Sequence, residues 1–428
     1  MRTPAEQQKQ RKGFLFDVFM TLSGQLFVML IALMLNKLMS MRLGPESFTG
    51  YTLITKSGGI LAYIVLVSLG ISLPRYIPMF RAQGNEKRES ATFFASLAIL
   101  VSASLFMAVA TIIFRLPLCK VFFGRYDVGS LFACFLFALK SAFTAYLYAL
   151  LRADGKFIRY SACQIIIDAS CLAISFAVSG STNIVVAMSA VGLLFSSALI
   201  LQEYWRAYKG RFQLSDIKFE IGTLLKYGVP RIPGEIILFS FTSVPLMILN
   251  NKFGAFHTAG FTISLGIISA ATPLFSYVGL VLLPYASEAL ARKEYSELNH
   301  RLFGLILLFL FLSICMVVAI RLLDTFVITL LYSSEYLQFV NTAHLIMPAI
   351  IPMSLYLLLR NPLDALAEFP INTVNLAIAF CVLTVGVTSS SSDGATAFSF
   401  VAGYFILGFL SVASFIFVMH RRKAESNG

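Results

Sequence analysis

The chain has 428 residues, of which 58% are hydrophobic and 13% charged, and its formal net charge is +12. Soluble domains carry roughly 25% charged residues and cannot hide so much apolar surface, so an ordinary soluble fold is excluded. The basic residues lie in short segments between apolar runs, which a membrane explains better than nucleic acid does. We therefore expect the lipid bilayer, and no nucleic acid, as a partner.

Apolar runs of about 20 residues, long enough to cross a bilayer as a helix, recur along the chain. None alternates with period two as barrel strands do, so the sequence predicts an all-α polytopic membrane protein. The first run is too long for the apolar part of a signal peptide and is expected to be retained as a span. Twelve spans are expected, at approximately 15–40, 49–73, 91–114, 128–151, 158–180, 183–205, 226–250, 258–283, 302–322, 338–359, 371–388 and 395–419.

The lysines and arginines between these spans are distributed unevenly. With alternate loops assigned to opposite sides, 23 fall on the side of the two termini and 6 on the other. Positive residues gather on the cytoplasmic side of membrane proteins, so both termini are predicted to be cytoplasmic.

The two halves align at a constant offset of 210 residues: LGPESFTGYTL is echoed by FGAFHTAGFTI, and SLPRYIPMFRA by LLPYASEALAR. Gly44 pairs with Gly254 and Pro74 with Pro284, and both residue types restrict backbone geometry. A chance match between two helical hairpins is the alternative. We expect these four residues to shape turns and gates.

Six spans per half is an even number, so the halves share one orientation. The sequence thus predicts two six-helix lobes, at 1–210 and 211–428, related by a parallel pseudo-two-fold repeat. Such repeats hold a substrate cavity between the lobes and suit alternating access. The junction at 203–228 is either an amphipathic surface helix, with Trp205 and Tyr208 as interfacial anchors, or a plain solvated linker.

Two lysines lie deep within apolar spans, Lys56 and Lys140. A charge at bilayer depth costs roughly 2.5–3.5 kcal/mol on insertion scales, so it is kept where it faces protein, water or an opposite charge. Lys56 shares a helical face with other polar residues, and the first four spans hold no acid at its depth. The repeat pairs Lys56 with Gly266 and Lys140 with Ile350, so this cationic character belongs to the N-terminal lobe.

Other charged side chains near or within the spans leave alternatives open. Lys140 and Asp168 could form one buried structural ion pair between neighbouring spans. Arg231 and Glu235, four residues apart, could pair along their own helix. Asp17, together with Asp168 and Glu235, is a candidate for ion or proton coupling.

Catalytic signatures are absent from the sequence: no Walker A motif, no GxGxxG after a strand, no HExxH and no GxSxG. The six cysteines show no CxxC spacing. We therefore expect a transporter rather than an enzyme, with no cofactor and no metal site.

The segments LMSMRLGPESFTGYTL, YGVPRIPGEIILF, FGAFHTAGFTISLGI and LLPYASEALARKEY resemble the polysaccharide transporters of the multidrug/oligosaccharidyl-lipid/polysaccharide (MOP) flippase superfamily. In size and style the chain is most similar to Wzx-type O-antigen flippases. The resemblance covers essentially the whole chain, through short glycine and proline turns. It implies a MATE-like pair of six-helix lobes in the bacterial cytoplasmic (inner) membrane.

The resemblance also implies a substrate. A Wzx-type flippase moves an undecaprenyl-diphosphate-linked oligosaccharide, such as the O-antigen unit of lipopolysaccharide, from the inner to the outer leaflet. The cationic cavity would meet the diphosphate through Lys56, Lys140 and Arg231. H+ or Na+ is the expected coupling ion, and a polymerase and a chain-length regulator are expected partners in the pathway. The alternative is a cation-coupled multidrug antiporter of the same superfamily, which would depend on acidic residues instead.

Overall fold

The computed structural model describes residues 4–209, 214–292, 295–366 and 369–427. Within these ranges the side chains of 4–23, 25, 214–215 and 423–427, and of several residues between 274 and 295, lie outside the described part. The described residues form helices and include no strand. They divide into an N-terminal unit, Met1–Leu43 with Gly50–Ile236, and a C-terminal unit, Gly44–Thr49 with Ile237–Gly428.

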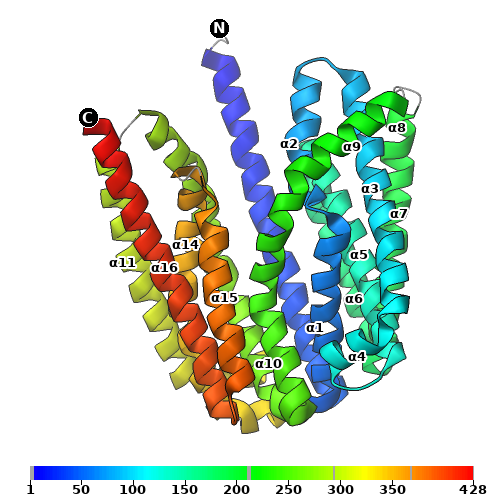
Figure 1. The fold of residues 1–428 in the computed structure, drawn as a ribbon, viewed down its shortest axis with the longest axis vertical. Helices are drawn as coiled ribbons and strands as arrows, with labels where there is room; N and C mark the ends of the chain where they lie inside the picture. The colour runs from blue at the N-terminus through cyan, green and yellow to red at the C-terminus, as the bar shows by residue number, and fades with distance from the viewer. Residues whose placement is uncertain (1–3, 210–213, 293–294, 367–368, 428) are drawn as a thin grey trace. The chain divides into compact units, whose positions relative to one another are not determined.

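The helices of the N-terminal unit form a bundle in which the turn between α2 and α3 lies at the same end as the chain's N-terminus (Figure 1). In chain order its elements are α1 (Pro4–Leu66, whose residues 44–49 belong to the other unit), α2 (Leu69–Ala82), α3 (Glu86–Ile113), α4 (Arg115–Phe123), α5 (Val128–Ala153), α6 (Phe157–Ala177), α7 (Ser181–Leu199), the π-helical turn η1 (Ile200–Trp205), α8 (Arg206–Tyr208), α9 (Leu214–Gly228) and the 3₁₀ turn η2 (Val229–Arg231).

The C-terminal unit repeats this plan, with the short helix α12 in the place of α4. Its elements are α10 (Ile232–Arg292, whose residues 232–236 belong to the N-terminal unit), α11 (Tyr295–Leu322), α12 (Asp324–Leu331), the 3₁₀ turn η3 (Ser334–Phe339), α13 (Val340–Ile346), the 3₁₀ turn η4 (Met347–Ala349), α14 (Ile350–Leu366), α15 (Ile371–Ser389) and α16 (Asp393–Asn427).

Two glycines bend the longest helices. Gly44 in α1 has φ 66° and ψ 173°, and Gly254 in α10 has φ 84° and ψ 173°. This backbone conformation favours glycine because it has no Cβ. The two residues are 210 positions apart, so the repeat seen in the sequence is also a repeat of backbone geometry.

Ten helices of the described residues are long and apolar enough to cross a membrane. Two of them, at 57 and 58 residues, are far longer than the roughly 20 residues that one span needs. These are Leu26–Ala82 and Asp216–Pro273, and each contains one of the two bends. Each therefore accounts for two expected spans, which brings the total to twelve. The predicted all-α polytopic fold is confirmed.

Small residues let the helices of each unit approach closely. A Cβ added to Gly58 in α1 would lie 2.7 Å from the Cys134 carbonyl oxygen of α5, and one on Gly24 would lie 2.6 Å from the Ser161 side chain of α6. In the C-terminal unit a Cβ on Gly408 would meet Pro352 at 2.7 Å. Close contacts at small residues are typical of helix packing in membranes, where burial of apolar surface contributes little.

The described residues of the junction between the halves are mostly helical, in η1, α8 and α9. α9 packs against α3, and Arg88 Nε binds Glu220 Oε1 at 2.7 Å. Tyr208 is buried rather than interfacial, whereas Trp205 is partly exposed and packs edge-on against Phe94. The structure groups residues up to Ile236 with the N-terminal unit, because these contacts hold α9 there; the sequence places the boundary at 210/211.

The second expected span, 49–73, is broken in its last third. Val67 and Ser68 both adopt positive φ, 48° and 54°, between the end of α1 and the start of α2. Positive φ is a genuine outlier for a β-branched residue. The segment around η2 contacts this break at two points. A Cβ on Gly228 would lie 2.6 Å from the Val67 carbonyl oxygen, and Ser68 Oγ donates to Glu235 Oε2 at 2.9 Å.

Candidate functional site

Lys56 lies on α1, twelve residues after the bend at Gly44, and its side chain is half-buried. Its neighbour Gly58 fits against the Cys134 carbonyl oxygen and the Phe137 ring of α5. Any side chain at position 58 would push this part of α1 away from α5. The close contact therefore fixes the depth and rotation of the turn that carries Lys56.

Lys140 is held by a neighbouring helix. Its methylene stem occupies the space beside Gly192 of α7, where an added Cβ would lie 2.9 Å from Cγ and Cε. Its Nζ lies 5.4 Å from the centroid of the Phe137 ring, within the range of a cation–π contact. A flexible stem wedged in this way keeps its charged end in a narrow region, which is what recognition of an anion requires.

Asp168 of α6 lies near Lys140 without touching it. The Lys140 charge acts on Asp168 and on Cys171, and the Asp168 charge acts on Tyr51 and Tyr148. Among the described side chains no ion pair within 4.0 Å joins Lys140 to Asp168. We call these five residues, from α1, α5 and α6, the Lys140 cluster. The hydroxyl of nearby Thr144 is buried with no hydrogen-bond partner in the described part of the chain.

Arg231 lies on the 3₁₀ turn η2, and its side chain is exposed. It donates from Nη1 to the Tyr227 carbonyl oxygen at 2.8 Å, and its Cζ lies 3.8 Å from the centroid of the Tyr227 ring. Glu235 accepts instead from Ser68, and no described ion pair joins it to Arg231. The alternative in which these two residues pair along one helix is thus not seen among the described contacts, and the 3₁₀ turn η2 changes the angular spacing that such a pair would need.

The remaining candidates are positioned as follows. Pro74 lies inside α2; it has no N–H to donate to the Gly70 carbonyl oxygen four residues earlier, and Arg152 Nη2 donates to that oxygen at 3.1 Å. Asp17 lies on α1 and Pro284 on α10, but both side chains are outside the described residues. Gly44 and Gly254 are the two bends.

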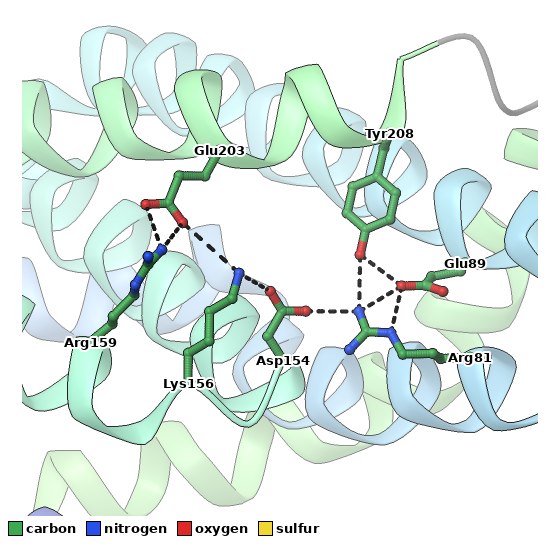
Figure 2. A network of polar contacts seen from close by, with 7 residues as sticks. All are labelled: Arg81, Glu89, Asp154, Lys156, Arg159, Glu203 and Tyr208. Carbon is green, nitrogen blue, oxygen red and sulfur yellow. Dashed lines mark hydrogen bonds and ion pairs between the residues drawn. The ribbon is translucent and has the colours of Figure 1, made fainter.

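Sequence reasoning missed a charged network at the end of the N-terminal unit that we expect to face the cytoplasm, here called the inner end. Figure 2 shows Arg81 pointing toward Glu89, Asp154 and Tyr208, while Lys156 and Arg159 approach Glu203. Arg81 Nη2 lies 2.6 Å from Glu89 Oε1 and 2.8 Å from Asp154 Oδ1, and Lys156 Nζ lies 2.7 Å from Asp154 Oδ2. The network ties together the ends of α2, α3, α5, α6 and η1.

Asp154 is the centre of this network. Partial burial alone would raise its pKa, but hydrogen bonds from Lys156 and Arg81 outweigh burial and hold the pKa of this carboxyl below its usual value. The carboxylate is thus ionised at neutral pH and contacts two basic side chains, one through each oxygen. Within the described residues no group of three or more His, Cys, Asp or Glu side chains could hold a metal ion.

The C-terminal unit has a different interior at the position paired with Lys56. There the Tyr332 hydroxyl occupies the space that a Cβ on Gly266 would take, and it donates to the Ile263 carbonyl oxygen at 3.2 Å. Phe48 and Tyr336 pack around the same ring, at centroid distances of 6.0 and 5.8 Å. Aromatic packing thus fills a region whose counterpart carries a cation.

No protein-family model matches the chain, and neither does any curated protein. Solved structures do resemble it. A multidrug resistance MATE family transporter of the MOP superfamily, in an inward-facing conformation, has a TM-score of 0.71 at 13% identity, with 94% of this chain and 96% of that chain covered.

Two further structures agree. The eukaryotic MATE transporter AtDTX14 has a TM-score of 0.64 at 13% identity, covering 96% of this chain and 99% of its own. A mutant form of the Vibrio cholerae MATE transporter VcmN has a TM-score of 0.62 at 15% identity, covering 96% of this chain and 97% of its own. This multi-pass membrane protein therefore has the fold of MATE family transporters.

Proposed function

We propose that this protein is a flippase that moves an undecaprenyl-diphosphate-linked oligosaccharide from the inner to the outer leaflet of a bacterial inner membrane by alternating access. The observation that carries the proposal is the fixed positive charge of the N-terminal unit. Lys56 and Lys140 are placed by close contacts at Gly58 and Gly192. A diphosphate carries at least two negative charges and would be attracted to such cations in a low-dielectric setting.

The resemblance to Wzx-type sequences supports this substrate class, and the MATE fold supports transport. The proposal includes cytoplasmic termini, an H+ or Na+ gradient as the driving force, and a polymerase and chain-length regulator as partners. Reporter fusions after residues 85, 155, 215 and 295 should report cytoplasm, and fusions near 44, 122 and 254 the opposite side. A signal from the opposite side at 215 would contradict the two-lobe topology.

The Lys140 cluster favours a second candidate. Asp168 is a half-buried carboxyl near Tyr51 and Tyr148, an environment suited to a proton or an organic cation. One structural relative is described as a multidrug resistance transporter. A cation-coupled antiporter would depend on Asp168, and neutralising Lys56 would leave its activity largely intact.

Two assays separate the candidates. The gene is expressed in a strain that lacks its own O-antigen flippase, and surface glycan is measured by blotting. It is also expressed in a strain without multidrug pumps, and drug accumulation is measured. The flippase proposal expects restored glycan that is lost in Lys140→Gln, with drug accumulation unchanged. Restored drug efflux that Asp168→Asn abolishes, without any glycan, would establish the antiporter instead.

A further inference from the structure

Two arginines at the inner half of the N-terminal unit share one tyrosine. Arg75 of α2 has its Cζ 4.6 Å from the centroid of the Tyr227 ring, and Arg231 of η2 has its Cζ 3.8 Å from the same centroid. The Tyr76 ring stands edge-on to Tyr227 at 5.5 Å and supports it from α2. Both guanidinium groups are therefore anchored to a single ring, although they come from segments about 150 residues apart in the chain.

The two cations are necessarily close together, since they cannot be farther apart than the sum of their distances to the shared centroid. Cation–π contacts at exposed sites are weak and offset only a small part of the repulsion between two such charges. Like charges at such a separation repel each other, and no carboxylate among the described residues lies within 4.0 Å of either arginine. Both side chains are exposed. Two exposed guanidinium groups held on one ring in this way are suited to binding an anion.

Other basic residues at the same end show that this is not the general rule. Arg81, Arg88, Lys156 and Arg159 each contact a carboxylate, from Glu89, Glu220, Asp154 and Glu203 respectively. The fold thus supplies a counter-charge to four cations of the inner end, whereas the pair on Tyr227, like Arg152, has no carboxylate within 4.0 Å among the described residues.

We propose that Arg75 and Arg231, spaced by Tyr227, form the site that first recognises the diphosphate of the lipid-linked substrate at the inner end. This inference rests on the proposed function for the identity of the substrate. Guanidinium groups bind phosphate oxygens in a bidentate manner, so two of them at fixed spacing suit two linked phosphates better than one. Tyr227 is a positioning residue, and the arginines carry the affinity.

The test is a direct binding measurement on the purified full-length protein in detergent, with farnesyl diphosphate as the probe and farnesyl monophosphate as the comparison. Arg75→Gln and Arg231→Gln should each weaken diphosphate binding about tenfold to a hundredfold, the usual loss for a hydrogen bond between charged groups. Arg115→Gln is the matched control. It makes the same charge change on an exposed arginine of α4 and should leave binding unchanged.

Tyr227→Leu tests the spacing. It keeps both charges, so binding should persist, but the preference for diphosphate over monophosphate should fall severalfold. An unchanged preference in this variant would overturn the positioning role of the ring. Diphosphate binding by the two arginine variants that equals that of the unsubstituted protein would overturn the site itself.

Two further measurements distinguish this inference from binding of ordinary lipid headgroups and from the proposed flippase function. If nanodiscs rich in phosphatidylglycerol displace farnesyl diphosphate as well as excess unlabelled farnesyl diphosphate does, the arginines bind ordinary lipid headgroups and the inference is wrong. Glycan export is measured in parallel. Arginine-dependent diphosphate binding in a protein that exports no glycan would refute the proposed function while supporting the diphosphate site.

Discussion

At the position paired by the internal repeat, the N-terminal unit carries the cation Lys56 and the C-terminal unit carries Gly266. The bends that precede these positions have nearly the same backbone angles, at Gly44 and Gly254. The repeat therefore preserves the glycine bends of the backbone, but it does not preserve the charged residue that follows the first bend. A lysine placed by helix contacts stands in one unit, and a buried tyrosine fills the equivalent space in the other.

This difference indicates that the two units contribute differently to stability and to transport. The C-terminal unit gains packing from Tyr332, whose side chain is buried and whose hydroxyl donates to the Ile263 carbonyl oxygen. The N-terminal unit instead carries Lys56 where we expect bilayer depth, and a charge at that depth is unfavourable in free energy. Such a cost is kept where the charge serves a function. We therefore expect changes in the C-terminal unit to affect folding first, and changes in the N-terminal unit to affect transport first.

The largest stability effect is expected for Gly266→Ala. The new Cβ would overlap the Tyr332 hydroxyl, so a buried ring must move and its hydrogen bond to Ile263 must lengthen. Overpacking of this kind costs about 1–3 kcal/mol, and a lost buried hydrogen bond adds to it. We expect a marked fall in thermal stability in detergent and in membrane abundance.

Two variants control the prediction for Gly266. Gly304→Ala on α11 has no neighbouring atom within 4 Å and should be neutral. The double variant Gly266→Ala/Tyr332→Phe removes the overlapping hydroxyl and should recover part of the loss. No recovery would mean that the overlap is not what makes Gly266→Ala unstable.

Gly192→Ala tests the N-terminal unit. It should lower stability by less than Gly266→Ala does, about 1–2 kcal/mol, because the contacting atoms belong to the flexible Lys140 side chain. Its effect on glycan export should exceed its effect on stability, since it displaces a charge. Membrane abundance and surface glycan are measured together. A loss of export that merely follows the loss of protein would argue against a role for Lys140.

The sequence predicted the spans and the bends because apolar run length and glycine or proline spacing are local properties. It could not predict that Gly192 seats the Lys140 stem, which depends on the register between α5 and α7. The spacing of Arg231 and Glu235 left their pairing open for a related reason, since a 3₁₀ turn interrupts the helix that an i,i+4 pair assumes. The positive φ of Val67 occurs at a break that Gly228 and Glu235 contact, and both of these residues lie far away in the chain.

The charged network of Figure 2 was missed because its members were counted only as loop charges that set topology. Glu89, Asp154 and Glu203 each stand near a helix end at the inner side, and that recurrence of acids among basic residues was the available signal. Loop residues meet only after the helices have packed, so the pairing itself could not be predicted from spacing.

This network gives the smallest expected effect. The folded pKa of Asp154 lies below its unfolded value of roughly 3.9, so its contribution to stability is fully present above that value and is lost as pH falls through the folded pKa. Asp154→Asn should cost about 0.5–1 kcal/mol at neutral pH, because its basic partners Arg81 and Lys156 are partly exposed to solvent, and it should flatten the decline in thermal stability below pH 4. An unaltered acid profile in Asp154→Asn would show that another carboxyl governs the decline.

The most direct test of the account is surface-glycan export by Lys56 variants in a strain lacking its own flippase, at matched membrane abundance. We predict that Lys56→Ala abolishes export, that Lys56→Arg keeps part of it because the charge survives in another geometry, and that Lys56→Asp is at least as defective as Lys56→Ala. Gly304→Ala serves as the neutral control. Full glycan export by Lys56→Ala would contradict the claim that the N-terminal unit recognises its substrate through this half-buried charge.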